Sequence, residues 1–144
     1  MSFADPTLRL TRQQDATIIG SCYDGLPYEA CGLLLGPMID AVASGMITGV
    51  HPCRNAAESA VVYTVDGRDY LRAARVAEAR GDEIVGVWHS HTHTDAYPSA
   101  TDVRQAADPG WLYVIVSLRD EAPMLRAYRI RDGGIVEIAV VLDR

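Results

Sequence analysis

The feature that most constrains this 144-residue sequence is an apolar run that leads directly into a cluster of histidines. Residues Asp82–Trp88 are largely apolar, with a bias toward β-branched side chains, and they predict a buried strand. Because side chains alternate along a strand, we expect His89 and His91 to share one face, about 7 Å apart along the chain. The same alternation places Val85 and Val87 on that face. Two imidazoles so placed can converge on one metal ion.

Asp102 is the natural third ligand. It follows His91 by eleven residues, after a Pro-Ser pair that predicts a turn and the start of a helix, so its carboxylate can return to the end of the strand. Catalytic zinc sites use three protein ligands and keep the fourth position for water. A purely structural interpretation remains open, because Ser99 and Asp102 also have the spacing of a capping box, which involves no metal.

The spacing His-x-His, seven residues, Ser, two residues, Asp, which begins at His89, resembles the signature of the JAMM (MPN-plus) zinc metalloproteases. Residues 27–36, which contain Glu29, resemble the family's segment around its glutamate, and the order of elements agrees over about residues 7–142. Members of this family are isopeptidases and peptidases that act on ubiquitin and ubiquitin-like proteins. The resemblance implies a single domain over residues 1–144 and one zinc ion per chain.

One position departs from the common family pattern. Many members have a proline after the second histidine, where this chain has Thr92. A threonine there, followed by the Tyr-Pro-Ser segment at residues 97–99, is similar to a bacterial branch that cleaves a sulfur-carrier protein from cysteine. The resemblance to this branch implies release of cysteine, a step of cysteine biosynthesis, from the Gly-Gly end of a ubiquitin-like carrier.

The resemblance also implies roles for two further residues. Glu29 would be the general base that takes a proton from the metal-activated water; its local sequence alone favours a solvated carboxylate in a turn. Ser99 would donate its hydroxyl to the oxyanion that forms during attack on the amide. The competing interpretation of Ser99 is a helix N-cap with no part in catalysis.

Other residues near the pattern allow alternatives. His93 continues the alternation and could be a fourth ligand, but it would then occupy the position needed by water. Cys31, close to Glu29, could form a nucleophilic pair with a histidine, although its leucine neighbours favour core packing. Asp95 and Tyr97 lie between the ligands and are either substrate contacts or polar loop residues.

Composition limits the partners. The net charge is −6, all thirteen basic residues are arginine, and no basic run is present, which argues against nucleic acid as a partner. Arg68, Arg72 and Arg75 form a helical stripe that is either a solvated face or a contact for an acidic partner. No apolar run approaches the ~18 residues of a membrane span, so we expect no membrane partner and a cytoplasmic location. The oligomeric state, including a homodimer, is left open.

The hydrophobic pattern predicts an α/β sandwich around a mixed central sheet flanked by helices. The family resemblance implies the same architecture, a single-domain MPN-like sandwich of the cytidine-deaminase-like type. Leu26-Pro27 cannot continue a helix, so we expect Glu29 in the turn that enters a strand at 31–35. We predict helices at 11–24, 66–80 and 99–107, and strands at 7–10, 31–35, 46–51, 61–65, 82–88, 111–117, 124–131 and 135–142.

The preferred function is therefore zinc-dependent hydrolysis of the amide between the carrier's C-terminal glycine and cysteine. Three alternatives remain. The chain could be a broader isopeptidase that releases ubiquitin-like modifiers from lysine, or an MPN-type interaction module without activity. It could also be a metal-storage or sensor protein that uses His89, His91 and His93. The interaction module is disfavoured by the complete set of ligands and the glutamate.

Overall fold

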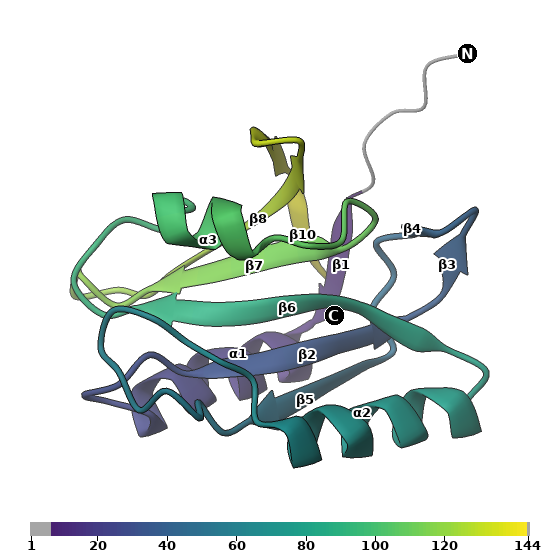
Figure 1. Cartoon of the computed structure of the whole chain (residues 1–144), viewed down its shortest axis with the longest axis horizontal. Coiled ribbons are helices and arrows are strands. Elements are labelled where there is room, and N and C mark those ends of the chain that lie inside the picture. The colour runs from purple at the N-terminus through teal and green to yellow at the C-terminus, as the bar shows by residue number, and fades with distance from the viewer. Residues whose placement is uncertain (1–6, 144) are drawn as a thin grey trace.

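The computed structural model describes residues 7–143, which are built around a six-stranded mixed sheet (Figure 1). The strand order is β5-β2-β6-β7-β8-β9. Only β6 and β7 run parallel, and every other neighbouring pair in this sheet is antiparallel. The strands are β2 (Cys31–Gly36), β5 (Gly49–Cys53), β6 (Glu83–His91), β7 (Leu112–Ser117), β8 (Met124–Arg131) and β9 (Gly134–Ile138).

Helices cover both faces of the sheet, which explains why β2 and β7 are buried along their whole length. The helix α1 (Arg12–Asp24) lies behind the sheet in Figure 1 and packs against the core cluster around Trp88. The helices α2 (Gly67–Ala79) and α3 (Ala100–Gln105) cover the other face, around Val87. All three predicted helices are confirmed, although α3 ends earlier than expected.

The last part of the chain divides between two sheets. The strand predicted at residues 135–142 is interrupted at Ala139, so that β9 remains in the main sheet while β10 (Val140–Asp143) leaves it. There β10 pairs in parallel with β1 (Leu8–Thr11). Leu8 and Leu10 of β1 are fully buried in the cluster around Trp88. Burial of these leucines requires a partner for β1, and the end of the chain supplies it.

Two predicted strands were placed wrongly. The strand expected at 46–51 is β5, shifted toward the C-terminus to include Pro52, which is tolerated because β5 is an edge strand. Residues 61–65 form no strand and make only an isolated bridge between Asn55 and Val65. A small hairpin, β3 (Met38–Ile39) with β4 (Val42–Ala43), follows β2. No helix within residues 7–143 has the length and apolar character needed to cross a membrane.

An irregularity in β6 decides which side chains reach the ligand face. Leu34 pairs with Gly86 and Leu35 pairs with Ile84, so Val85 is an extra residue in the ladder. Val85 therefore packs in the cluster around Trp88, and its predicted place on the histidine face was wrong. Alternation is regular from Val87 onward, so the predicted common face of Val87 and the two histidines holds.

The close approach of β2 to Trp88 makes a stability prediction. A Cβ atom added at Gly32 would lie 2.1 Å from Cζ2 of the buried Trp88 indole, so Gly32→Ala should lower the free energy of unfolding by about 1–3 kcal/mol. Gly20, which is exposed in α1 with no atom within 4 Å of an added Cβ, is the matched control. Gly20→Ala should raise stability by about 0.5–1 kcal/mol. Urea unfolding measures both, and equal stability of the two variants would contradict this packing.

Candidate metal centre

The end of β6 and the start of α3 bring three predicted ligands together. The Nε2 atoms of His89 and His91 lie 3.1 Å apart, and Oδ2 of Asp102 lies 3.2 Å from the first and 3.0 Å from the second. Both imidazoles are buried, and the Asp102 carboxylate is largely so. Together they form a group of potential metal ligands.

The helix start itself aims the carboxylate. Ser99 is the N-cap of α3, and its Oγ accepts a hydrogen bond of 3.0 Å from the backbone N–H of Asp102. In return, Oδ2 of Asp102 accepts a hydrogen bond of 2.9 Å from the backbone N–H of Ser99. The capping box and the ligand set are therefore the same arrangement, because one carboxylate oxygen serves both.

The donor set fits a zinc ion. Donor atoms bound about 2.0–2.2 Å from a tetrahedral zinc lie about 3.3–3.5 Å apart, close to the separations of 3.0–3.2 Å between these three atoms. Two imidazole nitrogens and a carboxylate are the ligand types that zinc takes in hydrolases, with one position left for water. His89 and His91 would hold the ion with Asp102.

Charge in the site favours cation binding. Burial lowers the pKa of His89 and so favours its neutral form, which has a lone pair for a metal. Burial opposes ionisation of Asp102, but hydrogen bonds with the two histidines outweigh it and hold the pKa of this carboxyl well below its usual range. Burial also lowers the pKa of His91, yet hydrogen bonds to Asp102 and to the Asp95 carbonyl raise it overall.

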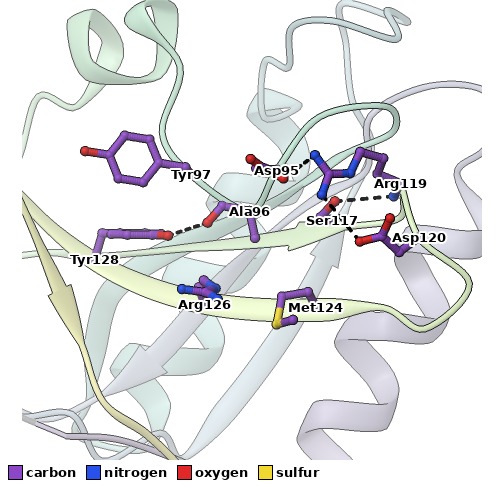
Figure 2. Close-up of a pocket in the computed structure, with 9 residues that line it drawn as sticks. All are labelled: Asp95, Ala96, Tyr97, Ser117, Arg119, Asp120, Met124, Arg126 and Tyr128. Atoms are coloured by element: carbon purple, nitrogen blue, oxygen red, sulfur yellow. Dashed lines mark hydrogen bonds and ion pairs between the residues drawn. The ribbon is translucent and has the colours of Figure 1, made fainter.

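The loop between His91 and Asp102 is held by hydrogen bonds from β7 and β8, and it fixes the ring of His91. Nδ1 of His91 donates a 2.7 Å hydrogen bond to the carbonyl of Asp95, which leaves Nε2 directed at the ligand group. Figure 2 shows this loop over β7 and β8, where the hydroxyl of Tyr128 donates to the carbonyl of Ala96. Ser117 likewise donates a 2.6 Å hydrogen bond to the carbonyl of Thr94.

Glu29 lies where the sequence predicts, in the turn that enters β2. The buried hydroxyl of Ser90 accepts a hydrogen bond of 2.8 Å from the N–H of Ala30, which ties this turn to the ligand strand. Cys31 stands opposite His89 in the ladder. The Glu29 carboxylate is 5% exposed and interacts electrostatically with His91 and Asp102, but it is not one of the ligand atoms. It has the surroundings of a proton carrier beside a metal.

Burial raises the pKa of Glu29 to about 7. Attraction to His91 lowers it, and repulsion from Asp102 raises it further, but desolvation is the largest cause. A carboxyl with a pKa near neutrality can both accept and return a proton at the pH of the cell. The role of Glu29 as general base stays a prediction.

Asn55 is a residue that the sequence analysis missed. Its Nδ2 donates hydrogen bonds to the carbonyls of Glu29 at 2.9 Å and Val62 at 3.1 Å. Its Oδ1 accepts hydrogen bonds of 3.0 Å from the N–H groups of Ala57 and Thr64. One buried amide thus holds the Glu29 turn against residues 55–65. The only local signal is an asparagine in a loop, a residue type that often bonds to backbone groups.

Tyr63 was assigned to a strand and instead covers a ligand. Its ring stacks on the imidazole of His89, with centroids 4.4 Å apart and planes 19° from parallel. The loop that Asn55 holds therefore shields one side of the ligand group from solvent. No spacing in the sequence points to this contact, because 26 residues separate the two rings.

The remaining candidates divide clearly. His93 is exposed, with Nδ1 2.8 Å from the Thr92 hydroxyl, and does not belong to the ligand group. The buried thiol of Cys31 donates to backbone carbonyls, and burial raises its pKa to about 12, which is unsuited to a nucleophile. Asp95 and Tyr97 line a pocket beside the ligands.

The chain is similar to known proteins over most of its length. The family model described as prokaryotic homologs of the JAB domain matches residues 12–131. The CysO-cysteine peptidase of Mycobacterium tuberculosis is 42% identical over 112 residues, 77% of this chain and 74% of that protein. The desampylase of Haloferax volcanii is 41% identical over 92 residues, 63% of each chain.

Solved structures agree with the fold. The solution structure of a protein from Desulfitobacterium hafniense has a TM-score of 0.82 and 32% identity, and covers 94% of this chain and 92% of its own. A JAB1/MPN domain protein from Archaeoglobus fulgidus has a TM-score of 0.58 and 20% identity, with coverage of 95% and 100%. The predicted MPN-type α/β fold is confirmed.

The raised pKa of Glu29 predicts a pH-dependent stability difference in metal-free protein. The folded state holds this proton up to about pH 7 and the unfolded state only to about 4.5, so stability falls as the pH rises through that window. Glu29→Gln removes this loss. Relative to wild type, the variant should gain up to about 3 kcal/mol between pH 4.5 and 8. Urea unfolding in a chelator measures it, and a pH-independent difference would refute it.

Proposed function

This chain belongs to the family of prokaryotic homologues of the JAB domain, and on that premise we propose that it is a zinc-dependent peptidase of a ubiquitin-like sulfur-carrier protein. The bond cleaved is the amide between the carrier's C-terminal glycine and cysteine, and the product is free cysteine for cysteine biosynthesis. The CysO-cysteine peptidase relative, 42% identical, supports this substrate. The observation that carries the proposal is the convergence of His89, His91 and Asp102 beside buried Glu29.

The residues divide the work of amide hydrolysis. Zinc, when bound, polarises the scissile carbonyl and lowers the pKa of a water molecule toward ~7. His89, His91 and Asp102 hold the ion. Glu29 takes the proton of the attacking water and delivers it to the nitrogen of the departing amine, so that cysteine leaves neutral at that atom. The Asn55 side-chain amide donates to the carbonyl of Glu29, and the N–H of Glu29 donates to the carbonyl of Ser59, so both bonds keep the Glu29 turn in place during the two transfers.

Ser99 can stabilise the oxyanion without giving up its structural role. Its oxygen accepts the N–H of Asp102, which uses a lone pair and leaves the hydroxyl proton available. That proton can be donated to the carbonyl oxygen as negative charge develops there. The N-cap and the oxyanion donor are compatible functions of the same hydroxyl.

An apolar cleft lies on the sheet face that carries the ligands. It has a volume of about 280 Å³ and lies between the face of β6 and β7 and the helices α2 and α3. Its walls include Leu33, Tyr63, Val87 and Tyr113. Tyr63 connects the cleft with the ligands, since it also stacks on His89. The cleft suits the extended tail of a carrier, with its terminal glycines toward the ligand group.

A lysine isopeptidase is the second candidate function. The desampylase of Haloferax volcanii, 41% identical over its matched region, favours it. The two functions share the acyl half of the substrate and the whole catalytic apparatus, and they differ in the amine that leaves. Conjugates of the same carrier to cysteine and to a lysine side chain separate them.

The decisive experiment uses a carrier protein with cysteine added after its Gly-Gly end. Zinc-loaded wild type should remove one cysteine from the conjugate, and chelation should abolish this. Glu29→Gln should retain one zinc per chain and lose at least about 10³-fold in turnover, because the proton carrier is missing. Mass spectrometry measures the product and atomic emission the metal. Failure of the zinc-loaded wild type to act on either conjugate would sink the proposal.

Ser99→Ala tests the hydroxyl. Loss of the N-cap should cost about 1 kcal/mol of stability, and loss of the oxyanion donor about 10²-fold in kcat at full zinc occupancy. Ser99→Thr, which keeps both the cap and the hydroxyl, is the matched control and should retain most activity. An unchanged kcat in zinc-saturated Ser99→Ala would limit Ser99 to the helix cap.

A further inference from the structure

A second cavity is lined in part by the loop between His91 and Asp102. This charged pocket has a volume of about 330 Å³ and opens beneath the loop that joins the ligands (Figure 2). Figure 2 shows side chains from that loop, from β8 and from the turn after β7 meeting around it. Its walls include Asp95, Tyr97, Arg119, Asp120, Met124 and Arg126. None of the roles described above uses Arg119 or Arg126.

The strand register places the pocket on the same sheet face as the metal ligands. His91 pairs with Ser117, and Ser117 pairs with Met124. In the same way, His89 pairs with Ile115 on β7, and Ile115 pairs with Arg126 on β8. Paired residues point to the same face, and neighbouring strands are about 4.8 Å apart, so the backbone of the pocket floor lies ~10 Å from that of the histidines.

The two cavities flank the ligands and differ in chemistry. The apolar cleft begins at Val87 and Tyr113, before the histidines along β6. The walls of the charged pocket include Ser117, which pairs with His91, and Met124, which pairs with Ser117. A substrate that crosses the metal must place its acyl part on one side and its amine part on the other. The apolar cleft suits the carrier tail, which leaves the charged pocket for the departing amine.

The cations of the pocket can exchange their partners. Arg119 pairs with the carboxylates of Asp95 and Asp120, the latter at 3.4 Å, and Arg126 lies 3.3 Å from Glu137. Every one of these side chains is about half exposed or more, so the ion pairs contribute little stability. A carboxylate brought in by a substrate can replace one of them at small cost.

We propose that the charged pocket receives the leaving group and that Arg119 recognises its free α-carboxylate. The inference deepens the proposed peptidase function and rests on it. A cysteine leaving group carries a carboxylate one carbon away from the scissile nitrogen, whereas a lysine side chain has four methylenes and no charge there. Arg119 is the better placed arginine of the two. It pairs with the carboxylate of Asp95, and the backbone carbonyl of the same residue accepts the hydrogen bond from Nδ1 of His91. The pocket therefore selects amino acids with a free carboxylate.

Two substrates that differ in one group test the inference. The carrier conjugate of cysteine is compared with the conjugate of cysteinamide, in which the carboxylate is replaced by a neutral amide. Wild type should prefer the free carboxylate by about 10–100-fold in kcat/KM, the effect of one charge-assisted hydrogen bond. In Arg119→Gln the preference should fall to near 1, and Arg119→Lys should restore part of it.

Arg131→Gln is the matched control, since Arg131 lies on β8 outside the pocket, and it should keep the full preference. Circular dichroism and the metal content verify that each variant is folded and loaded. Equal rates of wild type on both conjugates would overturn the inference and leave the peptidase intact. A preference that survives in Arg119→Gln would overturn the role of Arg119. Hydrolysis of neither conjugate by wild type would overturn the proposed function and this inference with it.

Discussion

The hydrogen bonds of the Asp102 carboxylate are the interaction on which the site depends. Oδ2 accepts the N–H of Ser99 at 2.9 Å and lies 3.0 Å from Nε2 of His91. The helix cap thereby fixes a carboxylate next to two buried imidazoles, which lowers the cost of ordering a ligand when a metal binds. A capping box and a metal ligand set are competing interpretations of the sequence, and the structure joins them in one oxygen atom.

Strand pairing supplies the other half of the site. After the bulge at Val85, the alternation of β6 places Val87, His89 and His91 on the sheet face that α2 and α3 cover. The hydrogen bond from Ala30 to Ser90 then holds the Glu29 turn beside the same strand end. Backbone pairing and a buried hydrogen bond therefore connect the Glu29 turn directly to the strand that carries both histidines. The flanking cavities, one apolar and one charged, belong to that face as well.

Elements whose signals are local could be predicted from the sequence. The capping box at Ser99, the apolar β7 and the alternation of the histidines all depend on neighbours within a few residues. Errors arose where a distant group decides. Residues 61–65 have a strand-like composition, but the Asn55 amide takes up their backbone groups. The strand β10 leaves the main sheet because it pairs with β1, which has its own backbone groups to satisfy.

The sequence by itself determined three potential metal ligands, the common strand face of the two histidines, the helix that carries Asp102 and the turn that carries Glu29, because periodicity and capping are properties of short segments. Only the tertiary structure decided that Glu29 is buried with a raised pKa, that Tyr63 stacks on His89, and that a charged pocket lies beyond His91. These features depend on contacts between segments tens of residues apart, whose register and packing are set by the whole sheet and are encoded in no single stretch of chain.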